Sequence, residues 1–118
     1  MDKVVEMSML LDFYGQMLTP RQYEIMDLHF NNDYSLGEIA EQLNISRQGV
    51  FDNIKRGKAI LNEYEEKLGL VDKFSHQKAK AEEILAEIKN IDVSRLDSGT
   101  TKILSRIEQS VRDIIYNI

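Results

Sequence analysis

The segment that most constrains the fold is residues 35–61, with the sequence SLGEIAEQLNISRQGVFDNIKRGKAIL. Ser35 and Glu38 form the S-x-x-E pattern of a capping box, which starts a helix. Apolar residues then recur at three- and four-residue spacing, so one face of this helix is apolar. They are Leu36, Ile39, Ala40 and Leu43. The pattern predicts a helix over residues 36–43.

A tight turn and a second helix are predicted to follow. Asn44 tolerates the left-handed backbone conformation of such a turn, and Ile45 is an apolar plug within it. Ser46 is a good N-cap for the next helix. The buried stripe of that helix consists of Val50, Ile54 and Leu61. Two helices joined in this way are typical of a helix-turn-helix, in which the second helix enters the DNA major groove. The alternative is a helical hairpin that binds nothing.

The start of the second helix supplies candidate groups for nucleic-acid contact. Arg47 and Gln48 occupy its first exposed positions, and these residue types pair well with guanine and adenine in the major groove. Gly49 allows close approach of the backbone, and basic residues further along suit phosphate contacts. The predicted nucleic-acid-binding residues are Ser46, Arg47, Gln48, Gly49, Asp52, Asn53, Lys55, Arg56 and Lys58. The alternative for the basic members of this set is an ordinary solvated helix face.

Residues 18–61 resemble the promoter-reading domain at the C-terminal end of bacterial sigma factors. The matching residues are Leu18, Pro20, Arg21, Gln22, Glu38, Ile39, Ala40, Leu43, Ile45, Ser46, Val50, Ile54, Arg56 and Leu61. The whole chain, with its acidic helical tail, more closely resembles the YlxM-like family of small bacterial helix-turn-helix proteins. This resemblance implies a regulatory protein, associated with the signal recognition particle pathway through gene neighbourhood.

Two residues depart from the sigma-factor pattern. In sigma-like domains, the positions that face the bases match Arg47, Gln48, Gly49, Asp52 and Asn53. Phe51 stands where a basic residue is usual, and Asp52 places a negative charge on the predicted DNA face. Phe51 is expected to pack against Tyr14 or Tyr23, to contact a thymine methyl, or to stack on an unpaired base. Asp52 either accepts a hydrogen bond from cytosine or repels phosphate.

Composition excludes several functional classes. The chain has 118 residues and no cysteine, so disulfides, thiolate metal sites and thiol catalysis are excluded. One proline and six glycines favour long helices. The sequence has no apolar run of membrane-spanning length and no signal-peptide pattern, so we expect a cytoplasmic protein without membrane insertion. It also lacks a phosphate-binding loop, an H-E-x-x-H motif and a nucleophile elbow, so we expect no enzyme activity and no cofactor.

The charge distribution is unusual for a DNA-binding protein. The net charge is −5, whereas phosphate contacts need basic side chains. Residues 1–34 hold two basic and six acidic side chains, and residues 62–118 hold nine basic and eleven acidic ones. Residues 35–61 hold four basic and three acidic side chains, so the helix-turn-helix is the one net-positive segment. Its electrostatic footprint for DNA is therefore weak.

Two more helices are predicted before residue 35. The first covers residues 2–14 and ends at Gly15 as a C-terminal cap. The second covers residues 18–30, where Thr19, Pro20 and Gln22 form a capping box with proline at the first helical position. The predicted apolar face of the first helix contains Val4, Val5, Met9, Leu10 and Phe13.

The second helix of the helix-turn-helix is predicted to end at residue 68, because Gly69 is a natural stop. After it, the sequence predicts a helical hairpin. The first helix has a coiled-coil-like seam and the last helix, after a loop at residues 92–99, has an apolar face. The seam contains Leu70, Phe74, Gln77, Ala81, Ile84, Ile88 and Ile91, and the face contains Ile103, Leu104, Ile107, Val111, Ile114, Ile115 and Ile118. These faces exceed what one hairpin covers, so we expect a homodimer; the alternative is a monomer whose hairpin folds over residues 1–30.

The combined prediction is an all-α protein. Residues 1–68 form a helix-turn-helix domain, within a class that includes sigma-like and winged-helix-like domains, and residues 69–118 form the C-terminal helical hairpin. The predicted function is a non-enzymatic DNA-binding regulatory protein acting in the signal recognition particle pathway. The alternative is an adaptor that binds RNA or protein components of that particle through the same surface. A third hypothesis is an anti-sigma-like decoy that engages RNA polymerase without touching DNA.

Overall fold

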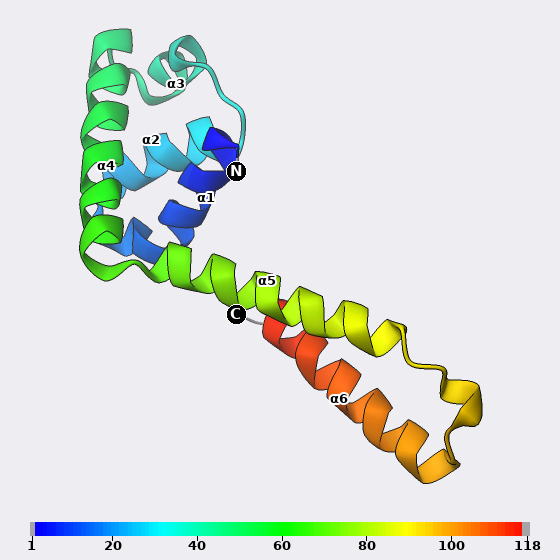
Figure 1. Ribbon diagram of the computed structural model, residues 1–118. Coiled ribbons are helices and arrows are strands. Elements are labelled where there is room, and N and C mark those ends of the chain that lie inside the picture. Colours follow the sequence, from blue (N-terminus) through cyan, green and yellow to red (C-terminus); the bar gives the residue numbers. More distant parts are fainter. Residues whose placement is uncertain (1, 117–118) are drawn as a thin grey trace. The chain divides into compact units, whose positions relative to one another are not determined.

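The computed structural model describes residues 2–116, and these fold into helices without any strand (Figure 1). The elements are α1 Lys3–Tyr14, the 3₁₀ turn η1 Gly15–Met17, α2 Pro20–Phe30, α3 Leu36–Leu43, α4 Arg47–Leu68, α5 Leu70–Lys89, the 3₁₀ turn η2 Val93–Arg95 and α6 Ser98–Tyr116. The all-α prediction is confirmed. Because the described residues contain no strand, they contain no wing of the winged-helix type. The chain divides into two compact units, one ending at Val71 and one beginning at Asp72.

Both predicted capping boxes are present. Thr19 Oγ1 accepts from the backbone N–H of Gln22 at 3.2 Å, and Gln22 Oε1 accepts from the Thr19 N–H at 3.1 Å. Ser35 and Glu38 make the same reciprocal pair, at 3.1 and 3.0 Å. The hydrogen bond that the Ser35 backbone donates holds the pKa of the Glu38 carboxyl below its usual value. These bonds satisfy amides at the starts of α2 and α3 that have no partner within their helices.

The turn between α3 and α4 has the predicted left-handed residue. Asn44 lies at φ 56° and ψ 47°, and its N–H points back to the carbonyls of Ala40 and Glu41. The N–H of Ile45 then donates to the Ala40 carbonyl at 3.0 Å. Ile45 is partly buried against the core, as its predicted role as a plug requires. The turn is therefore closed by backbone hydrogen bonds that need one residue with positive φ.

Asn44→Ala is expected to lower the free energy of unfolding by about 1–2 kcal/mol, because alanine is strained in the left-handed region. Asn44→Gly should cost much less, because glycine adopts this conformation readily. Urea titration followed by circular dichroism measures both changes. Asn62→Ala, on the exposed surface within α4, is the matched control and should be neutral or slightly stabilising. Equal losses for the alanine and glycine variants at position 44 would contradict the strain argument.

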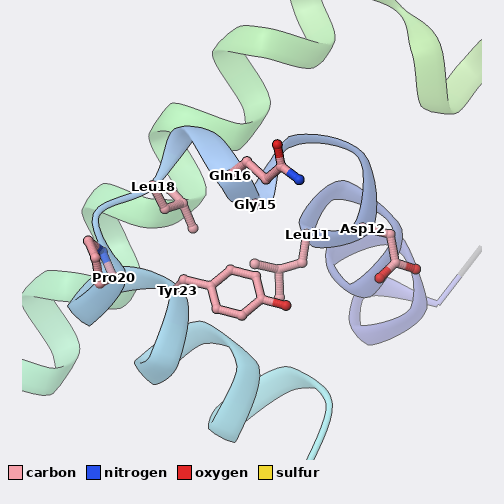
Figure 2. A pocket seen from close by; sticks show the side chains of 7 residues that line it. All are labelled: Leu11, Asp12, Gly15, Gln16, Leu18, Pro20 and Tyr23. Carbon is pink, nitrogen blue, oxygen red and sulfur yellow. The ribbon is translucent and has the colours of Figure 1, made fainter.

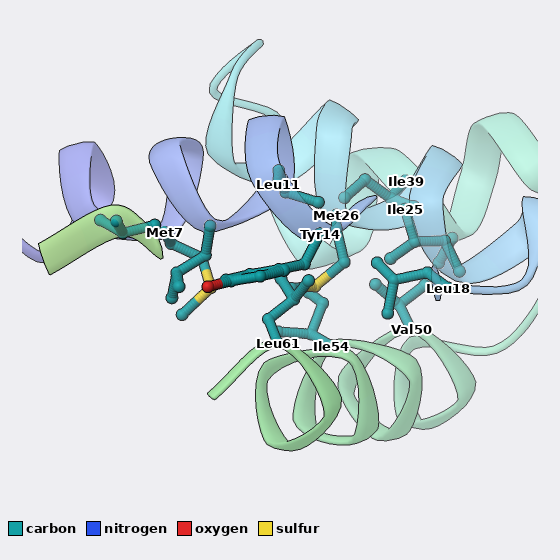
Figure 3. Close-up of a cluster of buried hydrophobic side chains, with 13 residues drawn as sticks. Met7, Leu11, Tyr14, Leu18, Ile25, Met26, Ile39, Val50, Ile54 and Leu61 are labelled. Carbon is teal, nitrogen blue, oxygen red and sulfur yellow. The ribbon is translucent and has the colours of Figure 1, made fainter. Parts of the chain in front are cut away.

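The core of the first unit lies among α1, α2, α3 and α4 (Figure 3). Gly57 allows α4 to approach α2 closely, because an added Cβ there would lie 3.0 Å from Met26 Sδ. The apolar stripe predicted for α4 is confirmed, since its buried residues include all three members of that stripe. The largest fully buried side chains are Leu10, Ile25, Met26, Ile39, Val50 and Leu61.

The predicted apolar face of α1 is wrong for three of its five members. Val4 and Val5 are each 50% exposed and Phe13 is 37% exposed. The residues of α1 that the core buries are Met7, Leu10, Leu11 and Tyr14. Apolar side chains surround most of this helix, so its periodicity does not select the face that packs.

Gly15 is the C-terminal cap of α1, as predicted, and its N–H donates to the carbonyl of Leu11. Its φ of −57° is right-handed, and Gly15 also begins η1. Its missing side chain has a packing role, because an added Cβ would lie 2.7 Å from Cε2 of Tyr23. In contrast, Gly69, which ends α4 as predicted, has a left-handed conformation, with φ 63°.

A buried hydrogen-bond cluster joins α1 to the junction between α4 and α5. Tyr14 is 3% exposed and its hydroxyl donates to Glu65 Oε1 at 2.6 Å. The same hydroxyl accepts from the N–H of Leu70 at 3.1 Å, and Glu65 Oε1 accepts from the N–H of Val71 at 3.0 Å. Burial, and then the bond to Glu65, raise the pKa of the Tyr14 phenol. Glu65 therefore caps the first turn of α5.

In the second unit, α5 and α6 form the predicted antiparallel hairpin (Figure 1). Ala81, Val111 and Ile115 are buried together, and Leu85 and Ile88 pack against them. The predicted loop is shorter than expected, because α6 begins at Ser98. Asp97 starts this helix by accepting from the N–H of Thr100 at 2.6 Å, which lowers the pKa of the Asp97 carboxyl.

The packed faces of the hairpin are narrower than predicted. Gln77 is exposed, so it does not pack between α5 and α6 as a polar residue of the predicted seam. Several predicted members of the seam and of the α6 face are about half exposed, namely Ile84, Ile91, Ile103, Ile107 and Ile114. Ile118 lies outside the described residues. The hairpin thus buries one row of each helix and leaves further apolar rows uncovered within the unit.

Candidate nucleic-acid interface

The helix pair α3 and α4 presents the N-terminus of α4 at the surface. Ser46 caps α4, with its hydroxyl accepting from the N–H of Gly49 at 2.9 Å. The guanidinium of Arg47 lies beside Gly37 in the first turn of α3, since a Cβ added to Gly37 would lie 3.9 Å from Arg47 Nε. The sequence offered no signal for this neighbour. The small residue leaves room for the arginine over the start of α3.

The nine predicted contact residues surround several sides of α4 and do not form a single face. Val50, Ile54, Gly57 and Leu61 define the buried side. At about 100° per residue, Gln48, Asp52, Lys55 and Arg56 lie opposite this side, Arg47 and Lys58 lie on one flank, and Gly49 and Asn53 lie on the other. Arg47, Gln48, Lys55, Arg56 and Lys58 are exposed, whereas Gly49, Asp52 and Asn53 are partly buried.

Side chains at the centre of the outward face are hydrogen-bonded to each other. Gln48 Nε2 donates to Asp52 Oδ1 at 3.0 Å, one turn along the helix. Bidentate recognition of adenine uses both the donor and the acceptor of a glutamine amide. Gln48 must therefore release Asp52 before it can read a base in this way.

Two other members of the predicted set have local structural contacts. Asn53 Nδ2 donates to the carbonyl of Gly49 at 2.8 Å, so its amide is turned along α4. Lys58 Nζ lies 5.4 Å from the centroid of the Phe30 ring, at the edge of α2, which is a favourable cation–π distance. These contacts tie both residues to the scaffold. Gln48, Lys55 and Arg56 on the outward face, with Arg47 at the start of the helix, remain the exposed polar groups best placed for a ligand.

The expectation that Phe51 packs on a tyrosine is wrong. Phe51 is 49% exposed, and at about 100° per residue it lies on the same flank of α4 as Lys58. Tyr14 instead stacks on Tyr64, with ring centroids 5.9 Å apart, and Tyr23 packs over Gly15. Both tyrosines therefore have other neighbours, so the Phe51 ring remains available to a ligand. An exposed ring is what two of the alternatives for Phe51 require, namely contact with a thymine methyl and stacking on an unpaired base.

A surface pocket of about 490 Å³ lies elsewhere in the first unit (Figure 2). Its walls come from α1, η1 and the start of α2, and no residue of α4 lines it. The lining residues are Leu11, Asp12, Gly15, Gln16, Leu18, Pro20 and Tyr23. The pocket is mostly apolar with one carboxylate, and it is separate from the predicted nucleic-acid-binding residues.

The helix-turn-helix class of proteins is defined by a short helix, a tight turn and a second helix that presents polar residues at the surface. This chain has all three, with a left-handed residue in the turn and a cap on the second helix. Residues 1–111 match the family model UPF0122, which is described as "Putative helix-turn-helix protein, YlxM / p13 like". The chain belongs to this family. The predicted YlxM-like resemblance is therefore confirmed.

Three relatives in this family match almost the full length of the chain. A UPF0122 protein of Acetivibrio thermocellus is 64% identical over 115 residues, covering 98% of each chain. A UPF0122 protein of Exiguobacterium sibiricum is 42% identical over 108 residues, covering 92% of this chain and 98% of the relative. One from Thermoanaerobacter sp. is 44% identical over 113 residues, covering 96% and 94%. Among residues 2–116, no helix is both long and apolar enough to cross a membrane.

Proposed function

We propose that this chain is a non-enzymatic DNA-binding regulatory protein that acts in the signal recognition particle pathway and reads duplex DNA with the first turns of α4. The observation that supports this function best is the exposed group Arg47, Gln48 and Lys55 at the start of a capped helix. The Asn44 turn holds that helix against α3 through backbone hydrogen bonds. A rigid helix start with free amides and basic side chains suits both base contacts and phosphate contacts.

The low net positive charge of residues 35–61 determines how the protein is expected to bind DNA. Few phosphate contacts mean weak non-specific affinity and a shallow salt dependence. Asp52 lowers non-specific affinity further through repulsion of phosphates. Specificity would then depend on base contacts from Arg47 and Gln48, with the Gln48–Asp52 hydrogen bond exchanged for a bond to a base. A homodimer would present two recognition helices to two half-sites, at spacings near one turn of DNA or a multiple of it.

The test begins with selection of bound sequences from a random pool of duplex DNA by the full-length protein. On the selected duplex, Arg47→Ala is expected to cost about 1–3 kcal/mol of binding free energy and to relax preference at one base pair. Lys55→Ala should weaken all sequences alike and reduce the slope of affinity against salt. Fluorescence anisotropy over a salt series measures both effects.

Lys78→Ala, which removes one exposed positive charge from α5, is the charge-matched control and should leave the affinity nearly unchanged. Equal, sequence-independent losses for the Arg47 and Lys55 variants would argue against direct base reading. No enrichment of any duplex in the selection would count against DNA as the ligand.

A second candidate function is an adaptor that binds RNA or protein components of the signal recognition particle through the same surface. The exposed Phe51 ring favours it, because aromatic rings stack on unpaired bases and anchor protein interfaces. The acidic Asp52 beside it is less costly against a protein than against phosphates. Phe51→Ala separates the two functions: it should abolish binding to single-stranded RNA or protein, but alter duplex binding only modestly.

A further inference from the structure

The second unit has an apolar row on α6 that its own hairpin does not cover. Ile103, Ile107 and Ile114 are 52%, 48% and 49% exposed. Together with Ser110 they follow steps of four, three and four residues, which is the spacing of a coiled-coil seam. These residues line a shallow groove of about 450 Å³ along the helix. Ser110, the small member at the centre, allows another helix to approach closely.

The same side of the hairpin carries an exposed apolar side chain from α5. Ile84 is 45% exposed. Ile84 and the α6 row each precede, by one residue, positions that pack inside the hairpin, such as Leu85 and Val111. In two antiparallel right-handed helices, the same rotation away from the shared interface points to the same side. Ile84 and the uncovered row of α6 therefore form one continuous apolar face, of a kind that soluble monomers rarely leave exposed.

The outer edge of this face has complementary charges. Arg106 borders the groove beside the isoleucines, and Asp113 follows it by seven residues. Residues seven apart lie nearly in line on a helix, so both side chains lie along one edge. Both are exposed, and Asp113 accepts a hydrogen bond from Gln109 at 3.0 Å. The edge is positive towards the start of α6 and negative towards its end, which makes it complementary to itself in the antiparallel direction.

We infer that this face is the homodimer interface and that α6 packs antiparallel on α6 of a second copy. A two-fold axis crossing the helix between Ile107 and Ser110 sets Ile103 opposite Ile114 of the partner subunit. The same axis brings Arg106 close to Asp113 of the partner subunit, and symmetry makes that pair twice. The occupant of the apolar face is thus a second copy of this chain, joined in a four-helix arrangement of two hairpins.

Sedimentation of the full-length protein without DNA tests the interface, and the wild-type protein should be a dimer. Ile107→Glu should yield monomers, because it buries a carboxylate in the apolar seam. Arg106→Asp should raise the dimer dissociation constant about tenfold, because two ion pairs become like-charge pairs. The double variant Arg106→Asp, Asp113→Arg should restore the dissociation constant close to that of the wild-type protein.

Val5→Glu, at an apolar position of α1 that is equally exposed, is the matched control and should stay dimeric. A wild-type monomer, or a dimer that Ile107→Glu leaves intact, would overturn the interface. If the charge exchange fails to rescue the dimer, the antiparallel arrangement is wrong, and this holds even where Ile107→Glu does not fold. Because DNA is absent, failure of the proposed DNA-binding function leaves these results unchanged.

Discussion

Ile39→Ala is expected to lower the free energy of unfolding of the N-terminal unit by about 2–5 kcal/mol. Ile39 is fully buried, at 0% exposure, and Figure 3 shows it beside Ile25 in the core. The loss combines the transfer free energy of the deleted methyl and methylene groups with the cost of the cavity that remains. Because Ile39 is on α3, the variant should also loosen the attachment of that helix to α2 and α4.

Urea or guanidinium titration, followed by circular dichroism, measures this loss. Val5→Ala is the matched control, because Val5 is half exposed and surface truncations usually change stability by less than about 0.5 kcal/mol. If Ile39→Ala cost no more than this control, α3 would not be packed as the structure shows. If the variant retains its helical content, it should also bind DNA more weakly, since a mobile α3 no longer positions α4.

Glu65→Ala should destabilise the protein by about 1–3 kcal/mol, although it removes a side chain on a helix surface. The reason is that Glu65 Oε1 accepts hydrogen bonds from the buried Tyr14 hydroxyl and from the N–H of Val71. Without the carboxylate, two donors lose their acceptor, and Tyr14 has little access to water. Chemical denaturation measures the loss.

Glu66→Ala supplies a closely matched comparison, because Glu66 is the next residue and is exposed. It should be nearly neutral. Tyr14→Phe should recover part of the stability when added to Glu65→Ala, because it removes one of the stranded donors. Additive losses in the double variant would show that the Tyr14–Glu65 hydrogen bond contributes nothing to stability.

The two proposed interfaces make different demands on the chain. Base reading needs a rigid start of α4, which the α3 turn and the Ser46 cap supply. Dimerisation needs only the second unit, where the uncovered row of α6 lies. Loss of dimerisation alone should therefore reduce affinity for a paired site while leaving the base preference of one half-site intact. Loss of Arg47 should do the reverse.

Asp52 and Phe51 are the residues on which the choice between DNA and another ligand depends. In the structure, the Phe51 side chain is about half exposed, and Asp52 accepts a hydrogen bond from Gln48. A sequence pattern alone left several contacts open for the phenylalanine, including burial against a tyrosine. Burial is now excluded, because Tyr14 and Tyr23 have other partners. What remains is a ring available for a thymine methyl, an unpaired base or a protein.

The sequence alone determined the features that depend on residues a few positions apart. Both capping boxes, the left-handed Asn44, the Gly69 cap and the bounds of α3 and α4 match their predictions. Each is a hydrogen bond or backbone conformation formed within one or two turns, so the necessary information is local. The spacing of apolar residues in α3 and α4 was equally informative, because each helix has one clear apolar stripe.

Only the tertiary structure decided which of several possible faces is buried. α1 has apolar residues around most of its circumference, and packing against α2 and α4 selected Met7 and Leu11 where the pattern favoured Val4 and Val5. The hydrogen bond between Tyr14 and Glu65 joins residues 51 positions apart, so no local pattern predicts it. The exposed apolar row on α6 was likewise identified only from the tertiary structure. Spacing identifies apolar residues, but the neighbouring helix determines which of them are covered.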